Sequence, residues 1–151
     1  MKEQILKPRK TGEERKRNHK ISIEKKIKRY IKDGSKGDLN LSRTPIEKLP
    51  DNLKVGGYLL LPNTLIKELP DNLQVGGGLY LDNTPIKELP DNLQVGGILF
   101  LTGTPIKELP DNLKVGGLFL QNTPLSKKHS EEEIISIIEE RGGYVKGIIV
   151  L

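Results

Sequence analysis

The sequence contains no cysteine and no tryptophan, and its only aromatic residues are four tyrosines and two phenylalanines. A chain without cysteine has no disulfide bond, no thiolate metal site and no thiol nucleophile. No apolar run approaches the roughly 20 residues that a membrane-spanning helix needs. The first residues also lack the long apolar core of a standard secretory signal. We therefore expect a cytoplasmic protein that does not associate with a membrane.

Sequence patterns of known enzymes are missing as well. The two histidines, His19 and His129, lie far apart in flanking segments. The glycine run at residues 76–78 precedes an apolar strand rather than a helix, so it is not a phosphate-binding loop. Four aspartates recur with one spacing, and we interpret them as solvated turn carboxylates rather than as a cation site: Asp51, Asp71, Asp91 and Asp111. We expect no enzymatic activity, no catalytic residue, no metal and no cofactor.

What the sequence does contain is one motif repeated four times. It reads Leu-Pro-Asp-Asn-Leu, then Lys or Gln, then Val-Gly-Gly, and it begins at Leu49, Leu69, Leu89 and Leu109. A short apolar segment with two leucines follows each copy. The period is 20 residues, and a fixed period in this range is typical of stacked solenoids. We therefore predict a solenoid with a parallel β-sheet built from stacked 20-residue coils.

Each coil has the pattern of a strand followed by a return arm. In one coil Leu79 and Leu81 alternate with outward residues, which predicts a strand with one buried face. Coils of this type stack at the strand spacing of roughly 4.8 Å. We expect one such strand per coil, and the strands of successive coils would form a single parallel sheet.

Proline and glycine mark the corners of each coil. Pro85 follows Thr84 at one corner, Pro90 opens another, and a Gly-Gly pair closes the coil where a sharp bend or a close backbone approach is needed. These corners leave no room for a helix, so we expect an extended or 3₁₀ return arm. Threonines recur at one corner and would satisfy buried backbone groups along the solenoid axis: Thr44, Thr64, Thr84, Thr104 and Thr123.

The string Leu-x-Leu-x-x-Thr-x-Ile-x-x-Leu-Pro resembles the leucine-rich repeat family in its short bacterial form. Residues 37–125 carry the resemblance, with Thr84 where that family usually has Asn and Gly76 where a leucine is usual. The Val-Gly-Gly repeats also resemble those of bacterial and phage proteins of unassigned role. The resemblance implies a partner-binding solenoid in a bacterium or a phage-infected host, with a secreted effector as an alternative. The ubiquitin-ligase activity of some bacterial relatives needs a cysteine and does not transfer.

Charge and pattern divide the chain into four segments. They are a basic arm (1–20), a capping helix (21–36), the solenoid (37–125) and a helix–strand cap (126–151). Residues 1–36 contain 14 Lys and Arg against 5 Asp and Glu, whereas residues 37–151 contain 11 against 15. This asymmetry predicts a partner that is anionic at one end.

The helix expected from Ser22 onward has two interpretations. Ile23, Ile27 and Ile31 recur on one helical face, and Gly34 would end the helix, so it would cap the open apolar end of the first coil. Its basic residues would be merely solvated, or they would also bind phosphate groups of nucleic acid. The candidate phosphate-binding residues are Arg9, Lys10, Arg15, Lys16, Arg17, Lys20, Lys25, Lys28 and Arg29.

The C-terminal segment contains a second helix signal. Ser130 and Glu133 form a capping box, and a glycine pair follows Arg141. The buried side of this helix would contain Ile134, Ile135, Ile137 and Ile138. A strand from Tyr144 to Leu151 would then pair in parallel with the sheet and cover the second open end of the solenoid.

The outward side of the predicted sheet is apolar from the second coil onward, although such positions are normally polar. Exposed apolar patches mark interaction sites, and aromatic residues dominate binding energy there. The candidate partner-binding residues are Tyr58, Leu60, Tyr80, Asp82, Ile98, Phe100, Thr102, Phe119 and Gln121. Three explanations are open: a protein partner binds there, the termini or a second copy in a homodimer cover the patch, or the side chains only stabilise neighbouring strands.

Two functions follow from these patterns. The first is a non-enzymatic protein–protein interaction module centred on Tyr80 and Phe100, with a partner of unknown identity. The alternative is a nucleic-acid-associated adaptor, or a phage-encoded inhibitor of a nucleic-acid enzyme (anti-CRISPR-like), that uses the basic arm and helix.

Overall fold

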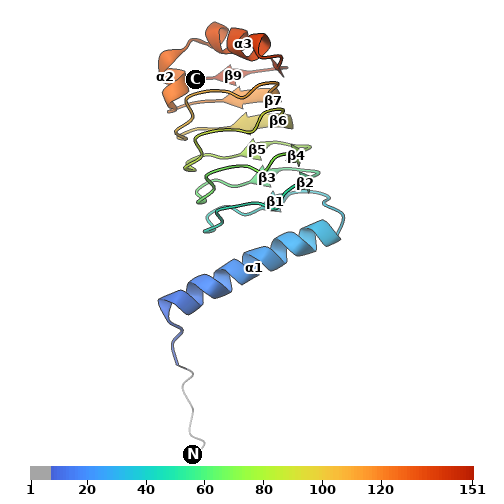
Figure 1. Cartoon of the computed structure of the whole chain (residues 1–151), viewed down its shortest axis with the longest axis vertical. Coiled ribbons are helices and arrows are strands. Elements are labelled where there is room, and N and C mark those ends of the chain that lie inside the picture. The colour runs from blue at the N-terminus through green and yellow to red at the C-terminus, as the bar shows by residue number, and fades with distance from the viewer. Residues whose placement is uncertain (1–7) are drawn as a thin grey trace, which may run out of the picture.

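The computed structural model, which describes residues 8–151, is a β-solenoid whose coils stack along the long axis of the molecule (Figure 1). Helix α1 (Gly12–Lys32) lies across one end of the stack. Helices α2 (Pro124–Lys128) and α3 (Glu131–Glu140) lie at the other end. The predicted fold, a solenoid of stacked parallel coils with helices at both ends, is confirmed.

Each coil contributes to two parallel ladders of strands, whereas we expected one. The first ladder follows the Leu-x-Leu segments and contains β1 (Leu39–Asn40), β3 (Leu59–Leu60), β5 (Leu79–Tyr80), the ends of β6 (Gln94–Phe100) and β7 (Lys114–Phe119), and β9 (Ile149–Val150). The second ladder precedes it in each coil and contains β2 (Lys54–Val55), β4 (Gln74–Val75), the starts of β6 and β7, and β8 (Tyr144–Val145). Strands β6 and β7 join the two ladders through the Gly-Gly corner.

Neighbouring coils are held in register along both ladders. Equivalent residues one period apart pair with each other, as Leu59 does with Leu79. Between β6 and β7 the register shifts after Val95, so that Phe100 pairs with Phe119. This shift absorbs the residue that the last full coil lacks. It keeps the leucines of the first ladder on the buried side, because strand side chains alternate between faces.

One hydrophobic core runs through the whole stack. The inward-facing leucines of the first ladder are buried in it, as are the valines that the repeat contributes to the second: Val55, Val75, Val95 and Val115. Ile23 and Ile27 of α1 close the core at one end, and Ile134 and Ile138 of α3 close it at the other. A coil in the middle cannot bury its apolar residues alone, so stability depends on contacts between neighbours.

The glycines between the two ladders are required by close backbone approach. Gly76 and Gly96 do not have positive φ angles, so the left-handed conformation is not their purpose. A Cβ at Gly96 would overlap the carbonyl oxygen of Gly76, and a Cβ at Gly76 would overlap that of Gly56. The sequence left two roles open for these glycines, a sharp bend or a close backbone approach, and the structure shows the close approach.

The other corners depend on asparagine and threonine. Asn92 has a φ of 63°, which Asn tolerates better than most residues, and its equivalents in other coils are similar. The Thr104 hydroxyl donates to the carbonyl oxygen of Leu101 in its own coil at 2.7 Å, and the other threonines follow the same rule. The expectation that these hydroxyls satisfy buried backbone groups is confirmed, and each bond stays within its own coil because a threonine at the end of a strand reaches its own turn most closely.

Helix α1 begins at Gly12, ten residues before the predicted start at Ser22. Thr11 and Glu14 form a capping box there, with each side chain accepting from the other's backbone N–H. Most of the predicted basic arm that the structure describes is therefore helical. Residues 1–7 of that arm lie outside the described residues.

The packing of α1 on the first coil corrects one further prediction. Ile23 and Ile27 are buried as expected, but Ile31 is 45% exposed. Tyr30 occupies the junction with the solenoid instead, and its hydroxyl donates to the carbonyl oxygen of Ser35 at 2.8 Å. Tyr30 continues the core-facing side of the helix after Ile27, so Ile31, one residue later, faces solvent.

The C-terminal cap matches the prediction in outline. Ser130 and Glu133 form the capping box of α3. Helix α2, capped by Thr123, was not predicted, and Ile135 is 37% exposed rather than buried because it faces away from the solenoid on α3. The predicted final strand is divided into β8 and β9, each of which extends one of the two ladders.

Candidate functional site

Six side chains form a continuous surface on the outward side of the first ladder, which we name the aromatic face. They are Tyr58, Leu60, Tyr80, Ile98, Phe100 and Phe119. The ring centroids of Tyr80 and Phe100 lie 4.2 Å apart with an interplanar angle of 14°, and those of Phe100 and Phe119 lie 4.8 Å apart. Tyr58 meets Tyr80 edge-on at 6.2 Å. The in-register ladder places the rings at stacking distance, because its strands are about 4.8 Å apart.

The aromatic face is partly open to solvent. Tyr58 is 49% exposed, and the other members are half-buried because each ring covers its neighbours. Gly78 lies beneath Tyr58 and Tyr80, where a Cβ would be 3.2 Å from atoms of both rings. Figure 1 shows the three helices at the ends of the stack, so none of them covers this face.

Polar residues lie beside the aromatic face, as the sequence predicted. Asp82 and Thr102 are half-buried, and Gln121 is exposed. Their backbone carbonyl oxygens accept hydrogen bonds from the preceding coil at 2.9 to 3.0 Å. These backbone bonds keep the three residues in line beside the aromatic face.

The last coil enlarges the aromatic face in a way that the sequence analysis missed. Ile148 is 58% exposed, and Val150 pairs with Phe119 at the end of the row. The sequence contained a signal for this extra coil. Val145 and Ile149 are spaced almost as Val115 and Leu118 are in the preceding coil, and the structure pairs them with those two residues. The apolar surface thus continues to the C-terminal end of the ladder.

The residues predicted to bind phosphate lie on α1 and directly before it. Arg9 and Lys10 precede α1, and the others lie on it, all of them exposed: Arg15, Lys16, Arg17, Lys20, Lys25, Lys28 and Arg29. Lys26 donates a hydrogen bond to the carbonyl oxygen of Asn40 in the first coil, which fixes the helix to the solenoid. The structure thus places all of these groups except Arg9 and Lys10 on α1, at the end of the solenoid formed by the first coil.

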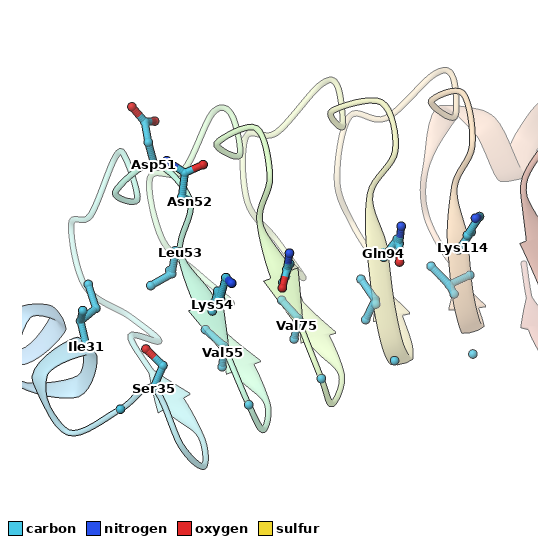
Figure 2. A pocket seen from close by; sticks show the side chains of 18 of the residues that line it. Ile31, Ser35, Asp51, Asn52, Leu53, Lys54, Val55, Val75, Gln94 and Lys114 are labelled. Atoms are coloured by element: carbon cyan, nitrogen blue, oxygen red, sulfur yellow. The ribbon is translucent and has the colours of Figure 1, made fainter.

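A groove of about 850 Å³ runs along the outward side of the second ladder (Figure 2), and we name it the polar groove. One side chain per coil forms its main row: Lys54, Gln74, Gln94, Lys114 and Tyr144. Beside this row lie four glycines and then a lysine: Gly56, Gly76, Gly96, Gly116 and Lys146. The sequence analysis missed the groove because it assigned these residues to the return arm and to its corner.

The charged columns of the return arm form one close ion pair among the described residues. Lys48 Nζ lies 2.9 Å from a Glu68 carboxylate oxygen, and this hydrogen bond and charge raise the pKa of Lys48. In the C-terminal cap, the backbone N–H of Glu132 and then the hydroxyl of Ser130 lower the pKa of the Glu132 carboxyl. All four groups are at the surface, so these effects are local.

In the part of the chain that the structure describes, residues 8–151, no three His, Cys, Asp or Glu side chains are grouped so that they could hold a metal ion. None of its helices combines the length and the apolar character required to cross a membrane. No family model, no curated protein and no solved structure matches the chain. Its function must therefore be inferred from the geometry of its surfaces.

Proposed function

We propose that this chain is a non-enzymatic binding module that contacts a protein partner through the aromatic face. The observation that supports the proposal most directly is the unbroken row of Tyr80, Phe100 and Phe119, stacked at 4.2 and 4.8 Å on the outward side of a rigid ladder. Rigid aromatic side chains offer a large contact area with little loss of conformational entropy on binding. Their partial exposure leaves apolar surface that a complementary protein can bury.

The test is a capture experiment from a nuclease-treated lysate of the native host, read by mass spectrometry. The baits are the intact chain, the double variant Tyr80→Glu/Phe100→Glu, and the control Leu65→Glu. Leu65 is 49% exposed but lies on the return arm, outside the aromatic face. We expect one protein to bind the intact chain and the control and to be lost from the double variant.

Two further measurements keep this test decisive. Far-UV circular dichroism shows whether each bait is folded, and an unfolded double variant would show that the rings hold the ladder together rather than form a free binding surface, which would contradict the proposal. Analytical ultracentrifugation shows whether the intact chain is a dimer that the double variant disrupts. That result would assign the face to a second copy of the chain instead of a different partner.

We also propose that the solenoid is related to the leucine-rich repeat family. The 20-residue coils, the parallel first ladder and the buried Leu-x-Leu pairs support this relationship. Binding through the outward side of the sheet is what the relationship implies. The continuous second ladder is the feature of this chain that the quoted repeat string does not describe.

A second candidate function, a nucleic-acid-associated adaptor or a phage-encoded inhibitor, rests on α1. The capping box at Thr11 extends the helix so that it carries most of the basic cluster on an exposed surface. A plot of log affinity against log salt concentration has a negative slope, and each phosphate contact by Lys or Arg makes that slope steeper by about 0.9 for duplex DNA. We expect Lys25→Glu/Lys28→Glu/Arg29→Glu to flatten the slope measured with a labelled DNA duplex. Undetectable binding at low salt would contradict this candidate.

A further inference from the structure

We propose that the polar groove binds an extended acidic peptide whose two carboxylates, four residues apart, pair with Lys54 and Lys114. The proposal concerns the second ladder and does not rest on the function proposed for the aromatic face. Figure 2 shows Lys54, Gln94 and Lys114 in one row along the groove, with Ile31 of α1 near one end.

The groove is a fixed consequence of the way in which the coils stack. A Cβ at Gly76 or Gly96 would overlap a carbonyl oxygen of the preceding coil, so these positions beside the row cannot carry side chains. Strand β4 beside these glycines pairs with β2 on one side and with β6 on the other. Gly76 and Gly96 are exposed, so the backbone beside the row is open to a main chain that approaches from solvent.

The charge of the groove is opposite to that of the solenoid. Three lysines line it, namely Lys54, Lys114 and Lys146, against one carboxylate, Asp51, near its α1 end. Residues 37–151 as a whole contain more acidic than basic groups, 15 against 11. In the part of the chain that the structure describes, these lysines have no carboxylate within ion-pair distance. A ligand that brings carboxylates would complement them.

The return arm shows that this charge pattern is specific to the groove. Every full coil of the return arm places a glutamate next to a lysine, as at Lys87 and Glu88. The row in the groove contains no carboxylate in any coil. The same 20-residue repeat therefore neutralises one side of the solenoid and leaves another side positive.

The spacing along the row favours an extended peptide. Lys54 and Lys114 are three coils apart, or about 14 Å at the strand spacing of about 4.8 Å. An extended chain advances about 3.4 Å per residue, so side chains four residues apart are separated by about 13.6 Å and lie on the same face. Carboxylates at these two positions of a bound strand would thus reach both lysines.

The middle of the groove suits a peptide main chain better than a nucleic acid. Gln74 and Gln94 lie between the two lysines, and an amide side chain both donates to a carbonyl and accepts from an N–H. Single-stranded nucleic acid would bring a charged phosphate to these neutral positions. It would also find one aromatic side chain for base stacking, Tyr144, among those that line the groove.

The test measures fluorescence anisotropy of a labelled nine-residue peptide of serine and threonine with two glutamates four positions apart. The full chain is titrated at low salt, together with Lys54→Gln/Lys114→Gln. The matched control is Lys67→Gln/Lys107→Gln, which removes two exposed positive charges from the return arm. We expect the groove variant to weaken binding about tenfold and the control to change it less than about twofold.

Three companion probes decide between ligands. One peptide has its glutamates three positions apart, which places them on opposite faces of an extended chain; the second has glutamine in place of both; the third probe is a labelled oligothymidylate. We expect weaker binding of both altered peptides. The proposal is overturned if no acidic peptide binds, if both lysine pairs matter equally, or if spacing has no effect. Tighter binding of the oligothymidylate that is lost in the groove variant would also overturn it.

Discussion

The two ladders of the solenoid share one coil spacing and one core, but they present different chemistry to solvent. The first ladder carries a stacked row of aromatic rings, and the second carries lysine and glutamine beside glycines. Both are built from the same repeat, and they are separated in each coil by a single Gly-Gly corner. The comparison shows that the buried residues of the repeat determine the fold, whereas its outward residues are free to differ between adjacent faces.

The corner between the ladders should be the most sensitive position. We expect Gly96→Ala to lower the free energy of unfolding by about 3 kcal/mol, because the new Cβ would force the backbone of two coils apart. Urea denaturation followed by circular dichroism measures the change. The control is Gly12→Ala, where a Cβ meets nothing within 4 Å. Equal stability of the two variants would show that the coils do not approach as closely as described.

Strand β6 allows the outward sides of the two ladders to be compared within one strand. We expect Phe100→Ala to lower the unfolding free energy by about 2 kcal/mol, since Phe100 contacts rings in both neighbouring coils. Gln94→Ala should change it by no more than about 0.5 kcal/mol, because Gln94 is exposed. The same denaturation experiment gives both values. Similar losses would mean that the rings do not stabilise one another.

The corner that leads into the second ladder should show a smaller effect. Asn92 has a φ of 63°, so Asn92→Ala should cost about 1 kcal/mol while Asn92→Gly costs less. Thermal unfolding of the two variants, measured side by side, tests the order. An alanine variant as stable as the glycine variant would show that backbone strain does not limit this corner.

The smallest effect is expected on the return arm, the third side of each coil. Glu68→Gln should lower the pKa of Lys48 toward its ordinary value, because Glu68 is the largest cause of its rise. A raised folded-state pKa stabilises the protein below the unfolded pKa of lysine, and this contribution disappears as the pH rises through the folded value. NMR titration of Lys48 measures the pKa. An unchanged pKa would show that the pair does not form in solution.

Much of this architecture could be predicted from the repeat. A fixed period and strict alternation determine which side chains are buried and which share a column, so the row of Tyr80, Phe100 and Phe119 was predicted correctly. The second ladder was not, because segments such as Lys54–Val55 are followed directly by two glycines and were therefore assigned to the return arm and its closing corner. The polar groove depends on that ladder and was missed with it.

The ends of the chain were predicted less well than the coils, for a different physical reason. Residues 12–20 contain no apolar period, so the search for a buried face placed the start of α1 too late. Thr11 and Glu14 were the available signal, since a capping box fixes a helix start without any burial. Ile31 fits the apolar period of the helix, but it lies in the last turn of α1 and is exposed. Periodicity alone does not show where a helix stops packing against the core.

The coils that begin at Leu69 and Leu89 share the identical stretch Leu-Pro-Asp-Asn-Leu-Gln-Val-Gly-Gly. Genetic exchange between two such copies adds or removes a whole coil and leaves every pairing on either side intact. The aromatic face and the polar groove would then lengthen or shorten together, in steps of about 4.8 Å. Related proteins with different numbers of coils would therefore have the same fold but binding surfaces of different length.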